Sequence, residues 1–454
     1  MNSSPQTPVV SRKLFPTPWK IFWTALTVRL LYMTLARTYR VRPIDQHFGF
    51  AWEAGRIARA LATGYGYADP FNGHTGPTAW LPPLYTLLIA GVFKIFGVYT
   101  AQSAWVLLAL NCVISAFIAL AVYEIACRCY GARVALWSGW IWALYPAAMQ
   151  YAVRWIWEMT LTTMLFAWIL VLALRMRGVG DDGPSSQQNQ QTWPRWLFFG
   201  LLWGLLALSN STPLIFLPVC ALWIFFGAPD KKRLFGKAAC AALVFCACLA
   251  PWMVRNQFAF HHFIPLRGNF GAEFYLGNGP GSSGLLMAYD HPFMDKDQLQ
   301  LYAKLGEVKY AAYRGHLGMD YVRAHPRHYA GICLLRFYYF WISVVHPFDD
   351  SVLVEFVRVL NFSFASVAGL LGLALSLKRR IPASKLFLWA FILMPLPYYI
   401  VVVHARFRHP LEPLICVLGV YLFQSAEPGW LGNWLRGSWL ARKLRRLTPL
   451  FRLG

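Results

Sequence analysis

Three acidic residues lie where they could do acid–base chemistry. Asp45 and Glu53 follow the first long apolar stretch, and Glu158 lies in VRWIWEMTLTTM, where a later one begins. An acid costs about 2.5–3.5 kcal/mol near the centre of a bilayer and less at its rim, so it needs a partner or a purpose. We therefore expect Glu53, or Asp45 in its place, as a catalytic base, with Glu158 as a second catalytic residue that orients a substrate. The structural alternative pairs each acid with a nearby arginine, Arg56 or Arg154.

A dense basic cluster lies in HARFRHPLEP, between two apolar stretches near the end of the chain. The guanidinium group offers planar paired donors that suit phosphate or pyrophosphate. We therefore expect Arg406, Arg408 and His409 to bind a substrate phosphate, and we add Arg358 to this set. The alternatives are ordinary anchoring at lipid head groups and, for Arg358, an ion pair with Glu355 three residues earlier.

The sequence predicts no specific metal or cofactor site. Several histidines and acids could together ligate a divalent metal, but no spacing among them is typical of a metal site; they are His74, His261, His262, Asp349 and Asp350. No metal ligand is therefore assigned, and the cofactor is unknown. The Gly-rich segment Gly277–Gly284 follows no strand, so we interpret it as a flexible lid rather than a phosphate-binding loop.

The composition places these residues in a membrane protein. The 454 residues are 57% hydrophobic and only 13% charged, whereas soluble domains carry about 25% charge. The net charge of +23 would suggest a nucleic-acid partner in a soluble protein, but in a membrane protein it is expected at the cytoplasmic rim, so we expect membrane lipids and no nucleic acid as partners. The nine cysteines lie mostly inside apolar runs and imply no disulfide framework.

Ten apolar stretches are candidates for transmembrane helices, which need about 20 residues each. They are Trp19–Thr38, Ala104–Ile125, Ala132–Gln150, Met159–Leu174, Trp196–Ser209, Leu214–Phe226, Lys237–Val254, Phe356–Leu377, Leu386–Val403 and Leu411–Phe423. Two more apolar runs are less regular, because Leu81–Gly97 is short and opens with two prolines, and Tyr329–His346 carries Arg336 at its centre.

The distribution of Lys and Arg decides how these two runs are interpreted. If neither crosses the membrane, the basic connections and both tails all lie on the cytoplasmic side. We therefore expect both to be interfacial or re-entrant helices on the outer face. The predicted fold is an all-α polytopic bundle of about ten transmembrane helices, with interfacial helices in two large outer loops.

This topology divides the chain into parts with distinct locations. The acids and the basic cluster then share the outer side of the membrane. The predicted parts are a cytoplasmic tail 1–18, a transmembrane module 19–260 with a first outer loop 39–103 and a second acidic loop 150–158, a long outer loop 255–351, transmembrane helices 352–424 and a basic cytoplasmic tail 425–454.

The chain resembles the GT-C membrane glycosyltransferases, especially bacterial relatives of protein O-mannosyltransferases and aminoarabinose transferases. The resemblance is carried by EAGRIARALATGYGY followed by PTAWLPPLYTLLIAGVFKIFG, by YPAAMQYAVRWIWEMTLT, by PWMVRNQFAFHHFIPLRGNFGAEFYLGN and by HARFRHPLEP. The first outer loop of that family often carries Asp-Glu directly after the first span. Here Asp45 is followed by Gln46, so the base stays open between Asp45 and Glu53.

The resemblance implies an inverting transfer of a sugar from a polyprenyl-phosphate donor on the outer face of the bacterial cytoplasmic membrane. The acceptor stays unknown. A carboxylate would deprotonate the acceptor hydroxyl, and the arginines would stabilise charge on the leaving phosphate. Two other classes remain open, a lipid or solute transporter or flippase, and a non-catalytic protein of envelope assembly. Carriers often show inverted repeats, and this chain shows none.

Overall fold

The computed structural model describes residues 18–41, 50–181, 191–227, 231–344 and 352–425. In these ranges the regular elements are all helices, in agreement with the predicted all-α fold. In chain order they are α1 (Pro18–Leu35), α2 (Glu53–Ala62), α3 (Pro83–Phe96), α4 (Ala101–Tyr130), α5 (Ala132–Leu144), α6 (Pro146–Val153), α7 (Met159–Arg177), α8 (Trp193–Ser209), η3 (Thr212–Phe216), α9 (Leu217–Phe226), α10 (Lys231–Phe260), α11 (Phe270–Asn278), η4 (Ala288–Asp290), α12 (Lys296–Leu305), α13 (Glu307–Ala324), α14 (Pro326–Ile342), α15 (Val352–Lys378), α16 (Ser384–Leu393), α17 (Leu396–Ile400), η5 (Ala405–Leu411) and α18 (Glu412–Ser425).

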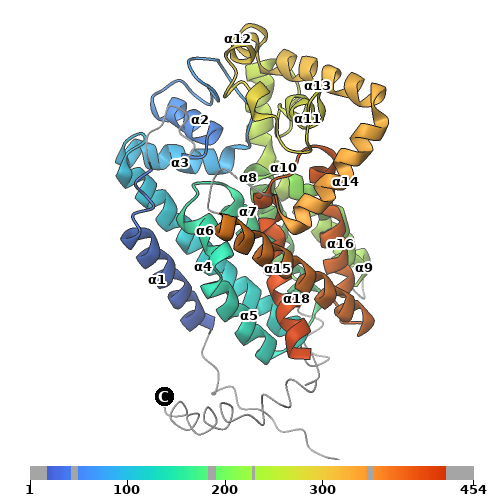
Figure 1. Ribbon diagram of the computed structural model, residues 1–454. Coiled ribbons are helices and arrows are strands. Elements are labelled where there is room, and N and C mark those ends of the chain that lie inside the picture. Colours follow the sequence, from blue (N-terminus) through green and yellow to red (C-terminus); the bar gives the residue numbers. More distant parts are fainter. Residues whose placement is uncertain (1–17, 42–49, 182–190, 228–230, 345–351, 426–454) are drawn as a thin grey trace, which may run out of the picture.

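The helices form a long bundle with a second layer at one end. In Figure 1, α1, α4, α5, α15 and α18 run along the bundle, while α2, α3 and α11 to α13 gather at the end that is uppermost in the view. Four described helices are long and apolar enough to cross a membrane, namely α4, α7, α10 and α15. Each contains one of the predicted spans, and the total of ten crossings stays a prediction.

A buried arginine joins the first helix to the bundle. Arg29 of α1 is fully buried and donates to the hydroxyl of Ser115 on α4 at 3.1 Å. It also donates to the carbonyls of Trp142 at 2.9 Å and Ala143 at 2.7 Å, at the end of α5. A charge in an apolar helix is tolerated when it faces the bundle and finds such partners. Arg29 therefore fixes α1 against α4 and α5.

Small residues allow the closest helix packing. A Cβ added to Gly200 of α8 would lie 2.1 Å from the carbonyl oxygen of Ala241 on α10, and one added to Gly372 of α15 would lie 2.1 Å from that of Leu418 on α18. Only glycine fits at such contacts, because the backbones touch directly. Gly200 and Gly204 are four residues apart, the spacing that commonly lets membrane helices approach each other.

The arginine at the centre of α14 forms hydrogen bonds inside the protein. Arg336 is fully buried and donates to the side-chain oxygen of Asn278 at 2.8 Å and to the carbonyl of Gly284 at 2.9 Å. It also donates to the carbonyl of Ile400 in α17 at 3.1 Å. Arg336 therefore holds the Gly-rich segment, predicted to be a lid, against α14 and α17.

A buried carboxylate joins the first outer loop to the long one. Glu307, at the start of α13, accepts hydrogen bonds from the backbone N–H of Ala79 at 2.8 Å and from the hydroxyl of Tyr302 at 2.9 Å. The hydroxyl of Thr78 donates to the same carboxylate oxygen as the Tyr302 hydroxyl. Because the bonds from Ala79 and Thr78 bridge residues more than 200 apart in sequence, they set the position of the upper layer over the bundle.

Candidate active site

Glu53 is the first residue of α2 and lies under the long outer loop. The preceding residue, Trp52, has a positive φ of 47°, which turns the chain sharply into the helix. The Trp52 ring stacks on Phe293 with centroids 5.0 Å apart, and the guanidinium of Arg56 lies 4.7 Å from the centre of the same ring. The segment around Phe293 is thereby fastened to the first turn of α2, and it covers the Glu53 carboxylate, of which 14% is exposed.

A neutral histidine faces this carboxylate. Nε2 of His291 lies 3.7 Å from Oε1 of Glu53. The backbone N–H of Phe293 donates to Nδ1 of His291 at 3.1 Å, which leaves the ring proton on Nε2, toward Glu53. Burial, together with the positive charge of Arg314, lowers the pKa of His291 to about 3, so the ring is uncharged at neutral pH. The contact is thus that of a neutral N–H with a carboxylate.

Charges of both signs surround Glu53. Burial raises its pKa to about 7, and the negative charge of Glu273 on α11 acts in the same direction. The positive charges of Arg406 on η5 and Arg267 before α11 oppose this rise. The pKa of Glu273 is also raised, again mainly by burial, and its carboxylate accepts a hydrogen bond from Asn269 at 3.1 Å. A carboxyl that titrates near neutral pH is suited to take and release a proton.

Aromatic rings hold Arg406 in this cluster and connect it to Glu158. The guanidinium of Arg406 lies 4.4 Å from the centre of the Trp157 ring. Tyr398 of α17 is within electrostatic range of Arg406, Arg267 and Glu158. Glu158 therefore borders the same group of charges as Glu53. No ion pair joins Glu158 to an arginine in the described ranges.

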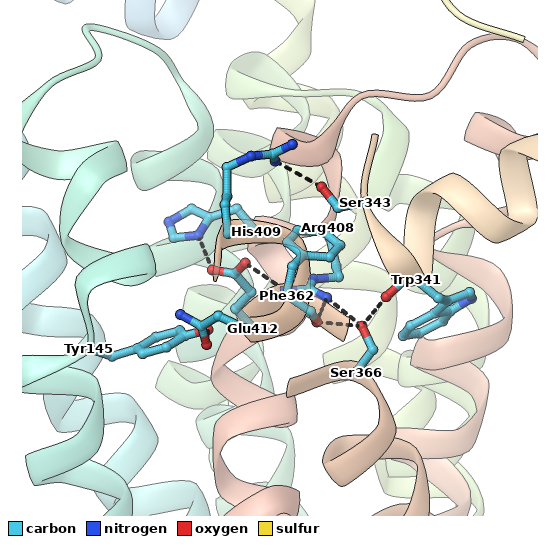
Figure 2. Close-up of polar contacts among 10 residues, drawn as sticks. Tyr145, Trp341, Ser343, Phe362, Ser366, Arg408, His409 and Glu412 are labelled. Atoms are coloured by element: carbon cyan, nitrogen blue, oxygen red, sulfur yellow. Dashed lines mark hydrogen bonds and ion pairs between the residues drawn. The ribbon is translucent and has the colours of Figure 1, made fainter. Parts of the chain in front are cut away.

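Arg408 and His409 point away from this cluster into the bundle. Arg408 is 1% exposed and donates to the carbonyl of Phe362 at 2.9 Å and to the hydroxyl of Ser366. Its guanidinium lies 3.4 Å from the carboxylate of Glu412, and Nδ1 of His409 lies 2.7 Å from the other oxygen of that carboxylate. Figure 2 shows these groups meeting between α15 and α18. The structure thus places the two arginines of HARFRHPLEP on opposite sides of η5.

Arg358 has partners on its own helix and on the end of α14. It forms an ion pair with Glu355 at 2.5 Å, the alternative foreseen from the sequence, and donates to the hydroxyl of Ser343 at 2.9 Å. Asp45, the other candidate base, lies outside the described residues.

No metal centre is formed in the described part of the chain. No group of three His, Cys, Asp or Glu side chains there is close enough to hold an ion. His74, one of the residues considered, instead contacts Asp69 at 2.9 Å. Asp349 and Asp350 lie outside the described ranges.

Three residues of the cluster were not expected from the sequence. Arg267, Glu273 and His291 come from the long outer loop, more than 200 residues after Glu53. Their spacing follows no pattern that would relate them to α2. Arg267 and Glu273 do lie in IPLRGNFGAEF, a segment that carried the family resemblance, so that resemblance was the available signal for these two.

Comparisons with known proteins agree with the fold. Residues 81–254 match the model of a family described as dolichyl-phosphate-mannose-protein mannosyltransferase. The apo oligosaccharyltransferase of Archaeoglobus fulgidus is 15% identical with a TM-score of 0.52, and the match covers 90% of this chain and 50% of that one. The chain has a GT-C fold. The resemblance to GT-C membrane glycosyltransferases stated from the sequence is thereby confirmed.

Two further matches have similar identity. The A. fulgidus oligosaccharyltransferase AglB in complex with an inhibitory peptide and a dolichol-phosphate is 14% identical, with 94% of this chain and 51% of that one covered and a TM-score of 0.51. ArnT from Cupriavidus metallidurans bound to undecaprenyl phosphate is 14% identical, with 91% and 82% covered and a TM-score of 0.40. This GT-C chain spans about half the length of the oligosaccharyltransferase structures it matches, and no curated protein sequence matches it significantly.

Proposed function

We propose that this chain is an inverting glycosyltransferase that moves a sugar from a polyprenyl-phosphate donor to an acceptor on the outer face of the bacterial cytoplasmic membrane. The main support is the position of Glu53, a nearly enclosed carboxylate with a pKa near 7 that faces two arginines. The solved structure with a dolichol-phosphate shares this fold. The acceptor stays open.

In the proposed reaction Glu53 is the general base. Its carboxylate takes the proton from an acceptor hydroxyl while the hydroxyl oxygen bonds to the anomeric carbon of the sugar. The bond from that carbon to the phosphate oxygen breaks, and its electron pair stays on the polyprenyl phosphate. Attack from the face opposite the leaving group inverts the anomeric centre. Asp45 remains the alternative base.

Arg406 and Arg267 are suited to the leaving phosphate. Both act on Glu53 electrostatically, so both lie where charge moves during the transfer. Two guanidinium groups in an enclosed site stabilise the growing negative charge more than they would in water. Arg408, His409 and Arg358, which the sequence also assigned to phosphate, hold their partners inside the protein and would keep η5 and α15 in place.

His291 and Glu158 complete the proposed site. The N–H of His291 lies 3.7 Å from one oxygen of Glu53 and would favour that oxygen electrostatically, leaving the other for the acceptor hydroxyl. Glu158, at the edge of the charge cluster, would orient the acceptor or the sugar. Both would act by positioning groups at the reacting carbon.

The test is release of the carrier lipid by purified protein. Incubation with a polyprenyl-phosphate sugar and a mixture of cell-envelope proteins, lipids and polysaccharides as acceptors is expected to release polyprenyl phosphate only when an acceptor is present, and NMR of the product should show an inverted anomeric centre. A transporter would move the lipid across vesicles without breaking the sugar bond. Acceptor-independent movement of intact donor, without release, would therefore contradict the proposal.

A further inference from the structure

An apolar groove runs along the bundle between α5, α15 and α18. It has a volume of about 380 Å³, and its walls come from residues such as Ile141, Phe364, Ile415 and Phe423. Arg408 and Glu412 line one end of it, and its lining includes none of Glu53, Glu273, Arg267 and Arg406. The groove is therefore separate from the charge cluster proposed as the active site.

Two hydrogen-bond donors at this end have no protein acceptor. Nε of Arg408 is buried and makes no hydrogen bond in the described residues. The side-chain oxygen of Asn361 accepts from the hydroxyl of Tyr145 at 3.1 Å, but no described group accepts from its amide nitrogen. Both residues line the groove. Asn361 is half-buried, so only Nε of Arg408 carries the cost of about 1–3 kcal/mol of a buried donor without an acceptor, and a ligand oxygen would remove that cost.

The net charge at this end of the groove restricts which kind of ligand oxygen can bind there. The positive charge of Arg408 is balanced by Glu412, 3.4 Å away, which also lines the groove. A phosphate would therefore meet a carboxylate with no excess positive charge, whereas an uncharged carbonyl would accept from both free donors without repulsion.

The depth of Asn361 fits a lipid ester. On α15 it lies about 25 Å from Lys378, at 1.5 Å per residue, and Lys378 ends the helix at the opposite rim. The hydrocarbon core of a bilayer is about 30 Å thick. Asn361 thus lies in the outer part of that core, on the side of the ester groups of glycerolipids. From there the groove follows α18 toward Phe423 for about 16 Å, enough for most of an acyl chain.

We propose that this groove binds one glycerophospholipid, with an acyl chain along α18 and an ester carbonyl accepting hydrogen bonds from Asn361 and Arg408. The lipid is not the sugar donor. It would fill the space between three helices and brace η5, whose other side carries Arg406.

The test measures retained lipid on the full chain. The protein is purified in detergent, incubated with dioleoyl-phosphatidylcholine or its diether analogue, and examined by native mass spectrometry. The ester lipid is expected to be retained about three- to tenfold better than the diether, which lacks the carbonyl. Ala365→Phe, which fills the groove, should reduce retention at least about tenfold. Val367→Phe adds the same bulk on the exposed face of α15, outside the groove, and should change nothing.

Asn361→Leu gives a test that does not depend on added bulk. It removes the amide donor, together with the oxygen that accepts from Tyr145, at nearly constant volume, and should lower retention of the ester lipid toward that of the diether, while the diether itself is unaffected. Equal retention by Ala365→Phe and Val367→Phe would overturn the proposal, and so would equal binding of ester and diether. Displacement of the phospholipid by undecaprenyl phosphate would also overturn it, because the groove would then belong to the carrier lipid.

Discussion

Two features of the Glu53 environment have opposite effects on its pKa. Its carboxylate is nearly enclosed, which favours the neutral form, and it lies beside two arginines, which favour the charged form. The balance puts its pKa near 7, so the proton is held and released over the pH range in which cells live. Residues arranged for chemistry often lower stability in this way, because the fold holds a group that would ionise more readily in water.

The pH dependence of the free energy of unfolding should reveal the raised pKa of Glu53. A carboxyl whose pKa is raised on folding binds its proton more tightly in the folded state, so its stabilising effect is full below pH 4.5 and is lost as the pH rises through 7. Glu53→Gln removes the ionisation. The wild type and Glu53→Gln should therefore differ by less than about 1 kcal/mol in stability near pH 5, and the variant should be more stable at pH 8, by up to about 3 kcal/mol, as followed by their melting temperatures.

Asp320→Asn supplies the control for this measurement. Asp320 is an exposed acid of the same outer layer, with 72% of its side chain accessible. Its substitution should leave the melting temperature unchanged at both pH values. A difference between Glu53→Gln and the wild type that stays constant from pH 5 to pH 8 would show that Glu53 has an ordinary pKa.

The role of His291 can be separated from a structural one by the pH profile. His291→Ala removes a neutral N–H dipole that lies 3.7 Å from the Glu53 carboxylate and favours its ionised form, so the pH of half-maximal kcat/KM for sugar transfer should move up by roughly half a unit or less. His291→Gln carries a side-chain N–H and should restore part of the shift. The groups that face Glu53 in both variants stay the same, namely Glu273, Arg267, Arg406 and Arg56. A lower rate with an unmoved profile would mean that His291 only supports the loop.

At the scale of elements, the side chains of η5 have different environments on its two sides. One side presents Arg406 to the charge cluster, and the other buries Arg408 and His409 against Glu412 (Figure 2). The sequence HARFRHPLEP shows that charged residues are dense here, but it does not show which way each side chain points. A short 3₁₀ helix between two apolar helices has no amphipathic pattern from which the directions could be predicted. The family resemblance and the all-α fold, in contrast, follow from long apolar stretches and from segments that are local in sequence.

The buried pair on η5 should be structural. Glu412→Gln leaves Arg408 buried with a weakened partner, so the apparent melting temperature should fall by an amount equivalent to about 3–5 kcal/mol. The double variant Arg408→Met, Glu412→Leu removes both charges and should recover most of this loss. If the double variant is no more stable than Glu412→Gln, the ion pair contributes more than its burial costs.

At the scale of the whole molecule, the site depends on contacts that sequence patterns do not record. Glu307 bridges α13 to the backbone of Ala79, and this bridge brings Arg267 and Glu273 over α2. Glu53 and Glu158 could be chosen from the sequence because an acid beside an apolar stretch is costly. Glu273 lies in a long loop where acids are unremarkable, so the residue pattern alone did not select it, and its proximity to Glu53 is seen only in the structure.

The proposed topology predicts which positions are accessible from outside the cell. In a background without the nine native cysteines, single cysteines at His262 and Asp320, both exposed, should react with a membrane-impermeant maleimide on intact cells. A cysteine at Arg379, at the opposite end of α15, should react only after the cells are opened. Labelling of position 379 on intact cells together with position 320 would place both ends of the bundle on one side and contradict the topology.

Sugar transfer by Glu53→Gln tests the central claim most directly. With purified protein, polyprenyl-phosphate sugar and acceptor at pH 7.5, the variant keeps the shape of the side chain but cannot take a proton. The account predicts a loss of about 10²–10⁴-fold in kcat, with Asp320→Asn at the wild-type rate. Turnover by Glu53→Gln within a few-fold of the wild type would remove Glu53 from the role of base.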